Sequence, residues 1–114
     1  MIYTYKAKVT KVYDGDTITV DIDLGFGMIF SNQNIRLFGI NAPEVRGVSK
    51  PQGIISRDGL RKMILGKTIT LQTIKDSKGK YGRYLGIIIL PKGESEININ
   101  DWLVENNLAE KHDY

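Results

Sequence analysis

Two short segments of this chain carry carboxylates beside residues that turn or stiffen the backbone. Asp14 and Asp16 flank Gly15 in the segment Asp-Gly-Asp-Thr, and Glu44 follows the run Gly-Ile-Asn-Ala-Pro. Carboxylate and amide oxygens are the hard ligands that Ca²⁺ and Mg²⁺ prefer, and a carboxylate can also serve as a general base. The two segments are therefore candidates for a metal site with acid–base chemistry.

Two arginines could complete such a site. Arg36 precedes the run that contains Glu44, and Arg83 ends the segment Lys-Tyr-Gly-Arg that begins at Lys80. A guanidinium group can donate two parallel hydrogen bonds to one phosphate. A cation, an activated water and positive charge around the transition state are the parts that metal-assisted phosphodiester hydrolysis requires. If the segments meet in space, the sequence predicts that chemistry.

Each segment taken alone also fits an ordinary structural role. Asp-Gly is a common hairpin turn, Arg36 could be a surface strand residue, and the segment 80–83 could be a charged hairpin end. There is also a geometric difficulty, because Arg36 and Asn41 are five residues apart and a regular strand would point them to opposite faces. They can share a site only if the chain bends between them.

The composition bounds the class of protein and the kinds of site. The 114 residues, 41% hydrophobic and 25% charged, predict one domain over residues 1–114, which we expect to be a monomer. The lack of Cys excludes disulfides, thiolate catalysis and Cys-ligated zinc. A single His, His112, is too little for a His-rich metal site or a Ser-His-Asp triad, and we interpret it as a bystander in a frayed tail.

Charge and apolar runs bear on partners and location. The net charge is +3, and Lys and Arg outnumber acids between residues 57 and 83, which permits a nucleic-acid partner. No apolar run is long enough to span a bilayer, and the first residues lack the apolar core of a signal peptide. We therefore expect no membrane partner and a cytoplasmic location, although a mature secreted chain would look the same.

Hydrophobic periodicity predicts a mainly β protein with helices. Strands are expected over residues 6–13, 17–24, 28–40, 67–74 and 81–90, and helices over residues 54–65 and 98–107. The polar run 31–34 predicts a bulge or loop, and Pro43 should stop strand pairing near Ala42. The order β-β-β-α-β-β-α matches a five-stranded OB-fold Greek-key barrel, with a helix between strands 3 and 4 and a C-terminal helix.

Two stripes of apolar side chains are predicted to face the core of this barrel. In the second strand they alternate with polar residues, and in the first helix they follow a helical period. The predicted inward residues are Ile18, Val20, Ile22 and Leu24 on the strand, and Ile55, Leu60, Met63 and Ile64 on the helix.

The polar segments together resemble one known family. Asp-Gly-Asp-Thr, an Arg before Gly-Ile-Asn-Ala-Pro-Glu, a helix, and Lys-Tyr-Gly-Arg occur in the order and spacing of the staphylococcal nuclease (thermonuclease) family. The similarity extends over roughly residues 6–109, including Asn-Asp-Trp-Leu-Val from Asn100 onward. This resemblance implies an OB-type barrel and a calcium-dependent nuclease that cleaves DNA and RNA and leaves 3′-phosphates.

The resemblance also implies a role for individual positions. The metal ligands would be Asp16, Asn41 and the backbone carbonyl of Ala42, with Asp14 as a nearby supporting acid. Glu44 matches the general base, and Arg36 and Arg83 match the two arginines that hold the phosphate. Lys80 and Tyr81 match contacts to a terminal phosphate, and Tyr114 is a loose counterpart of an aromatic residue that helps to bind the base.

One position departs from the pattern of the family. The second metal carboxylate is usually Asp, whereas this chain has Asn41. An amide can still offer a neutral oxygen, but the site loses one negative charge, so we expect lower metal affinity or a changed metal preference. The alternative hypothesis is a weakly active or inactive OB-fold module that binds nucleic acid without cleaving it.

Overall fold

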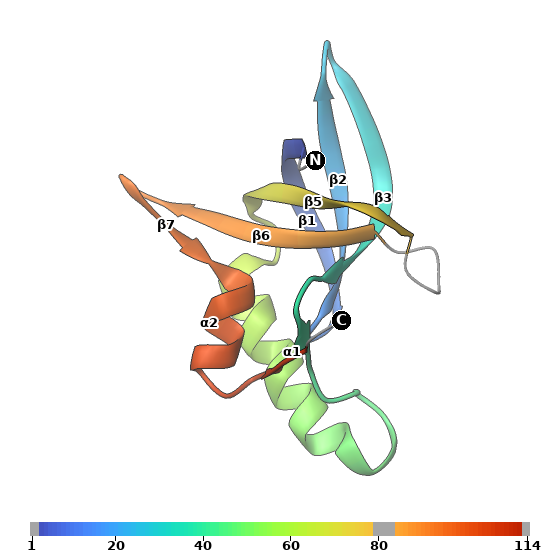
Figure 1. The fold of residues 1–114 in the computed structure, drawn as a ribbon, viewed down its shortest axis with the longest axis vertical. Coiled ribbons are helices and arrows are strands. Elements are labelled where there is room, and N and C mark those ends of the chain that lie inside the picture. The colour runs from blue at the N-terminus through green and yellow to red at the C-terminus, as the bar shows by residue number, and fades with distance from the viewer. Residues whose placement is uncertain (1–2, 79–83, 113–114) are drawn as a thin grey trace.

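The computed structural model describes residues 3–78 and 84–112, and strands make up most of it. The elements in chain order are β1 (Tyr3–Asp14), β2 (Thr17–Gly25), β3 (Met28–Leu37), β4 (Ile40–Asn41), a 3₁₀ turn (Gly47–Ser49), α1 (Lys50–Ile64), β5 (Thr68–Lys78), β6 (Tyr84–Lys92), β7 (Ser95–Asn98), α2 (Ile99–Glu105) and β8 (Glu110–Lys111). Figure 1 shows the strands wrapping around one another above the two helices, with the β2–β3 hairpin projecting away from them.

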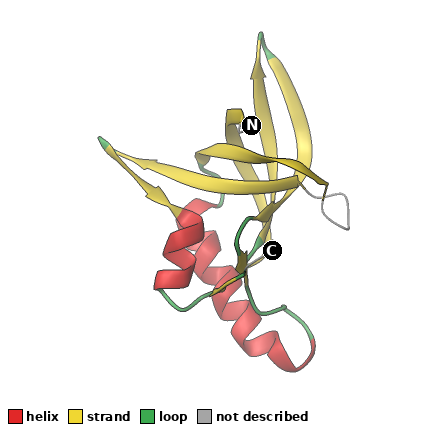
Figure 2. Cartoon of the chain, in the orientation of Figure 1, coloured by secondary structure: helices red, strands yellow, loops and turns green. Residues whose placement is uncertain are grey.

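A parallel contact closes the strands into a barrel. The sheet runs in the order β3-β2-β1-β5-β6-β7, and β3 also pairs with β6. In that parallel pair Ile35 lies opposite Tyr84, and Leu37 lies opposite Gly86. The closed barrel thus consists of β1, β2, β3, β5 and β6, with α1 between its third and fourth strands and α2 after its fifth (Figure 2). This confirms the predicted OB-fold arrangement.

The third strand is shorter than predicted. It ends at Leu37, and Ile40–Asn41 forms a separate strand, β4, which pairs with β8 instead of continuing the barrel. The predicted irregularity at residues 31–34 is confirmed, because the β2–β3 register shifts between Val20 and Ile22 and Asn32 has a φ of 56°. The shift bends the hairpin where it leaves the barrel.

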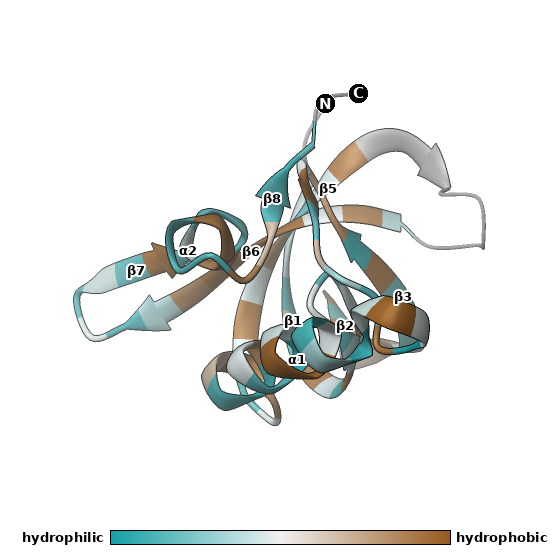
Figure 3. Ribbon diagram, turned by 90° about the horizontal axis from the view of Figure 1, so that it is seen from below, coloured by the Kyte–Doolittle hydropathy of each residue, from teal (hydrophilic) through white to brown (hydrophobic). Residues whose placement is uncertain are grey.

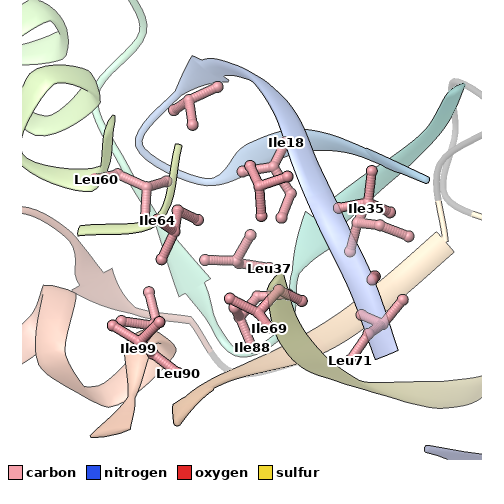
Figure 4. Close-up of a cluster of buried hydrophobic side chains, with 14 of the residues drawn as sticks. Ile18, Ile35, Leu37, Leu60, Ile64, Ile69, Leu71, Ile88, Leu90 and Ile99 are labelled. Carbon is pink, nitrogen blue, oxygen red and sulfur yellow. The ribbon is translucent and has the colours of Figure 1, made fainter. Parts of the chain in front are cut away.

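Aliphatic side chains fill the barrel and the space between it and α1. Ile18, Val20 and Ile22 are buried as predicted, and Figure 4 shows Leu60 and Ile64 of α1 entering the same cluster. Two predicted core residues are exposed instead. Leu24 is 43% exposed because it lies at the projecting end of β2, and Ile55 is 54% exposed.

Ile55 is exposed because α1 turns a different face to the barrel. The buried positions of this helix are Gly53, Ser56, Leu60 and Ile64. Ile55 lies one residue before Ser56, and successive residues are about 100° apart around a helix. Figure 3, coloured by hydropathy, shows apolar and polar segments alternating around α1. Within residues 3–78 and 84–112, no helix is both long and apolar enough to cross a membrane.

Candidate metal and phosphate site

Asp16 lies in the turn between β1 and β2 and is only 7% exposed. Its Oδ2 accepts a hydrogen bond from the backbone N–H of Ala42 at 2.7 Å, and its Oδ1 accepts one from the Thr17 hydroxyl at 3.1 Å. The first bond ties the carboxylate to the segment after β4, although the two segments are far apart in sequence. Asp16 is therefore held in place before any ligand binds.

The turn can approach that segment because residue 15 has no side chain. A Cβ atom at Gly15 would lie 2.7 Å from the Cβ of Ala42 and 2.9 Å from the Cβ of Ser56, closer than packed carbon atoms allow. Ser56 in turn donates a hydrogen bond of 2.6 Å to the carbonyl of Leu108. Gly15 therefore allows three parts of the chain to pack at one point. These are the turn that carries Asp16, the residue after β4 and helix α1.

A bend at Phe38 and Gly39 resolves the geometric difficulty raised by the sequence. Gly39 has a φ of 80°, and the N–H of Phe38 donates to the carbonyl of Gly86 on β6 at 2.8 Å. The bend places Arg36 and Asn41 on the same side, so that Arg36 Nη2 donates a hydrogen bond to Asn41 Oδ1. The two side chains share one site, as the resemblance required.

Arg36 links the two candidate metal ligands through one guanidinium group. Besides its bond to Asn41, its Nη1 lies 3.3 Å from Asp16 Oδ2. The same nitrogen donates to the carbonyls of Ile40 at 2.9 Å and of Leu37 at 3.1 Å. The oxygens of Asp16 and Asn41 therefore already converge on a positive group.

The second carboxylate of the turn has a different environment. Asp14 Oδ1 accepts a hydrogen bond from the backbone N–H of Asp16 at 3.0 Å. Burial raises the pKa of Asp14 to about 7, and the neighbouring side chain and charge of Asp16 act in the same direction. Asp14 thus stabilises the turn and carries a proton over much of the mildly acidic range.

Glu44 lies on the loop after β4, and its side chain points into solvent. The side chain is 70% exposed, and its Oε2 lies 3.9 Å from Nε of Arg46. An open cleft of about 1240 Å³ contains Glu44 together with Asp16, Arg36 and Asn41. Ala42 also lines this cleft. The structure therefore brings together the predicted base, one of the predicted arginines and the three residues of the predicted metal site.

Helix α1 fixes the backbone of this loop. A Cβ atom at Gly53 would lie 2.0 Å from the carbonyl oxygen of Glu44 and 2.8 Å from the backbone nitrogen of Val45. The loop therefore rests directly on the helix backbone. From the same helix, Arg57 and Arg61 line the cleft, and Lys11 lines it from β1, so its wall is rich in cations.

Four predicted contact residues, Lys80, Tyr81, Arg83 and Tyr114, lie outside the described residues. The roles assigned to them by resemblance stay predictions.

Two residues near the site were not recognised from the sequence. Our prediction that His112 lies in a frayed tail was wrong, because its Nδ1 lies 3.0 Å from Asn41 Nδ2 and its N–H donates to the Gly39 carbonyl at 2.8 Å. The second residue is Asn100, which is buried, with only 4% of its surface exposed. No local pattern reveals either contact, since both depend on pairing between distant segments.

Asn100 holds the bend before β4 from the side of α2. Its Nδ2 donates to the carbonyls of Phe38 at 2.9 Å and Gly86 at 3.1 Å, and its Oδ1 accepts from the N–H of Ile88 at 3.0 Å. One buried amide thus satisfies three backbone groups. It connects the β3–β4 bend to β6 and so helps to position Asn41.

The chemistry of the oxygen donors fits a hard divalent cation. Among residues 3–78 and 84–112, no three His, Cys, Asp or Glu side chains form a metal-binding group. A cation here would rely on the carboxylate of Asp16, the amide oxygen of Asn41, backbone oxygen and water, which are suitable ligands for Ca²⁺ or Mg²⁺. With a single close carboxylate, we expect binding to be weak.

Comparison with known proteins is consistent with this arrangement. A family model described as staphylococcal nuclease homologue matches residues 34–114. The chain is 33% identical to a thermonuclease of Staphylococcus hyicus over 88 residues, covering 75% of this chain and 48% of that protein. It is 29% identical to a thermonuclease of Staphylococcus intermedius over 104 residues, covering 89% of this chain and 56% of that protein.

An archaeal protein is similar over a comparable length. The chain is 28% identical over 126 aligned residues to an uncharacterized protein of Methanocaldococcus jannaschii, with 92% of this chain and 58% of that protein covered. The chain therefore spans about half the length of the curated relatives it matches.

Proposed function

We propose a nuclease activity for this chain, which belongs to the staphylococcal nuclease family. The reaction would be hydrolysis of phosphodiester bonds in DNA, RNA or both, with low sequence specificity and 3′-phosphate products. The observation that carries the proposal is the convergence of Asp16, Arg36, Asn41 and Glu44 on one open cleft. Two relatives named thermonucleases, of Staphylococcus hyicus and Staphylococcus intermedius, support the same reaction class.

The proposed mechanism divides the work among the residues of the cleft. Ca²⁺ would be held by Asp16, Asn41 and the carbonyl of Ala42, and would supply positive charge next to the phosphate. Glu44 would accept a proton from the attacking water. Arg36 and Arg83 would donate hydrogen bonds to the phosphate oxygens as negative charge develops on them. Breaking the bond on the 5′-oxygen side leaves the phosphate on the 3′ end.

The cationic wall of the cleft supports a nucleic-acid substrate. Lys11, Arg57 and Arg61 line it beside the proposed catalytic residues. Such groups bind the phosphate backbone without reading the sequence, and their contribution falls as the salt concentration rises. The proposal therefore expects binding that weakens steeply with salt and differs little between unrelated sequences.

The proposal is tested with the purified chain and single-stranded DNA or RNA, in Ca²⁺ and then in EDTA. We expect cleavage only with Ca²⁺, 3′-phosphate ends on the products, and a loss of about 10²-fold or more for Glu44→Ala. Glu94→Ala, an exposed residue of the β6–β7 turn, is the matched control and should leave the rate unchanged. Cleavage that survives chelation, or that survives Glu44→Ala, would contradict the mechanism.

A second candidate function is binding of nucleic acid without cleavage. The observation that favours it is Asn41 in the place of a metal carboxylate, together with the guanidinium of Arg36 already contacting Asp16 and Asn41. This alternative expects retention of DNA or RNA with no cleavage at any Ca²⁺ concentration. It also expects Asn41→Asp to create no activity, whereas the nuclease proposal expects Asn41→Asp to strengthen Ca²⁺ binding.

A further inference from the structure

We propose that His112 is a positioning residue, which orients the Asn41 amide so that its oxygen, and not its NH₂ group, faces Arg36 and the candidate cation site. The effect of this orientation on Ca²⁺ affinity rests on the proposed function, but the orientation itself does not. His112 reaches this position because β8 pairs with β4, with Lys111 opposite Ile40 and Glu110 opposite Asn41. A hydrogen bond of 2.8 Å from the His112 N–H to the Gly39 carbonyl extends the pairing.

The chemistry of the neighbours identifies each end of the Asn41 amide. Arg36 carries only donors, so the atom that faces its Nη2 must be the amide oxygen. The NH₂ group then faces His112, whose Nδ1 lies 3.0 Å away. Because an NH₂ group can only donate, Nδ1 must accept, which places the proton of a neutral imidazole on Nε2.

This orientation matters because the site has an amide and not a carboxylate. Either oxygen of an Asp could face a cation, so its rotation by 180° changes nothing. An Asn has one oxygen, and its rotated form would present N–H hydrogens toward the cation and toward the donors of Arg36. A partner that accepts from the NH₂ end therefore gives Asn41 one productive orientation.

Arg36 selects the same orientation, but a cation between Asp16 and Asn41 would compete with its guanidinium for the same oxygens. His112 contacts the opposite end of the amide and does not compete with the cation. The contact between His112 and Asn41 can therefore persist when a cation is bound, whereas the contact between Arg36 and Asn41 would be disturbed. This assigns to His112 a role that the carboxylate-containing version of the site would not require.

The orientation is tested first by NMR in the absence of metal. In the wild-type protein, His112 Nδ1 should give the ¹⁵N shift of an unprotonated acceptor and Nε2 that of a protonated nitrogen. His112→Phe keeps a ring but removes the acceptor, and it should move the side-chain amide signals of Asn41, while Lys111→Ala should not. A protonated Nδ1 in neutral His112, or Asn41 amide signals unchanged by His112→Phe, would overturn the proposal.

The functional consequence is tested by calorimetric Ca²⁺ titration of four proteins. These are the wild type, His112→Phe, Asn41→Asp and the double variant, each first shown to be folded by its melting curve. We expect His112→Phe to weaken Ca²⁺ binding about tenfold in the wild-type background. In the Asn41→Asp background it should not weaken binding, because a carboxylate needs no orientation. An equal loss in both backgrounds would overturn the positioning role.

The two proposals fail in different ways. If the wild-type protein and Asn41→Asp bind no Ca²⁺, the metal-dependent nuclease proposal falls, and the NMR experiment alone decides whether His112 orients Asn41. If Ca²⁺ binds and cleavage occurs but His112→Phe has no selective effect, the nuclease proposal stands and the positioning role is rejected.

Discussion

The two carboxylates proposed to do the chemistry lie in opposite kinds of environment. Asp16 is buried and contacts a backbone N–H, a hydroxyl and a guanidinium group. Glu44 is largely exposed and lies near Arg46. The buried contacts of Asp16, the proposed metal ligand, thus contribute to the stability of the folded barrel. The side chain of Glu44, the proposed base, lies on a loop and contributes little to it. Changes to Asp16 should affect both stability and activity, and changes to Glu44 should affect activity alone.

The largest expected effect comes from Asp16→Ala, which removes a proposed ligand and leaves Arg36 and the Ala42 N–H without their buried acceptor. We expect cleavage to fall about 10³-fold and the free energy of unfolding to fall by about 3 kcal/mol. The measurements are Ca²⁺-dependent cleavage and urea unfolding.

Two comparisons sharpen this prediction. Asp23→Ala removes an exposed carboxylate of β2, the strand that follows the Asp16 turn. This carboxylate accepts from the Gly25 N–H, and its loss should change both quantities little. Glu44→Ala should reduce cleavage while leaving unfolding within about 0.5 kcal/mol of the wild type. If Glu44→Ala destabilised the protein as much as Asp16→Ala, the contrast between the two carboxylates would be wrong.

The next effect tests whether the Glu44 loop is fixed by its backbone. In Gly53→Ala the new methyl group would overlap the Glu44 carbonyl, so the loop must move. We expect a loss in cleavage rate of up to about 10²-fold and a destabilisation of about 1–3 kcal/mol. Gly59→Ala is the matched control in the same helix, because its methyl group would meet only the end of the Leu108 side chain. Equal losses in both variants would show that the position of Glu44 is not the cause.

A smaller effect is expected from the amide that holds the β3–β4 bend. Asn100→Ala leaves the carbonyls of Phe38 and Gly86 and the N–H of Ile88 without this partner, which should cost about 2–3 kcal/mol in unfolding free energy. Asn106→Ala is a suitable control, because its amide is exposed and donates to Trp102 at 2.8 Å. Urea unfolding of the two variants side by side measures the difference, and similar losses would contradict a special role for Asn100.

The smallest effect concerns Asp14, whose raised pKa couples stability to pH. The folded state holds a proton on Asp14 up to about pH 7, whereas the unfolded chain releases it near the ordinary carboxyl pKa of 3.8. The folded state binds more protons between these values, so this group's contribution to stability is complete below pH 4 and is lost as the pH rises through 7. In EDTA, Asp14→Asn should remove this slope and raise stability at pH 7 by roughly 1–2 kcal/mol. Thermal melts from pH 4 to 8 measure it, and a steeper slope in the variant would contradict the assignment.

Much of the fold follows from local sequence patterns. The period-two alternation in β2 and the helical pattern before Gly66 predict elements that the structure confirms, because these patterns report which face is buried. The prediction failed where burial depends on geometry beyond one element. Leu24 continues the alternation but lies past the end of the barrel, and Ile55 follows a helical period on a face that α1 turns away.

The candidate site was predictable as a set of segments but not as an arrangement. The motif order identified Asp16, Arg36 and Glu44, and the structure brings them into one cleft. The alternation of side chains along a regular strand could not show that Arg36 contacts Asn41. That contact depends on a bend between them, which Asn100 holds from a distant helix. His112 was misread for the same reason, since a two-residue strand pairing has no periodic signal.

The pairing of β3 with β6 also determines at which stage of protein synthesis the site can form. A nascent chain that has emerged only through α1 already contains Asp16, Arg36 and Glu44, but not the strand that fixes the bend between Arg36 and Asn41. That bend requires Gly86 and Asn100, and β4 requires β8. Because such distant contacts form slowly, the site should be among the last parts of the molecule to assemble, after the polypeptide has emerged through His112.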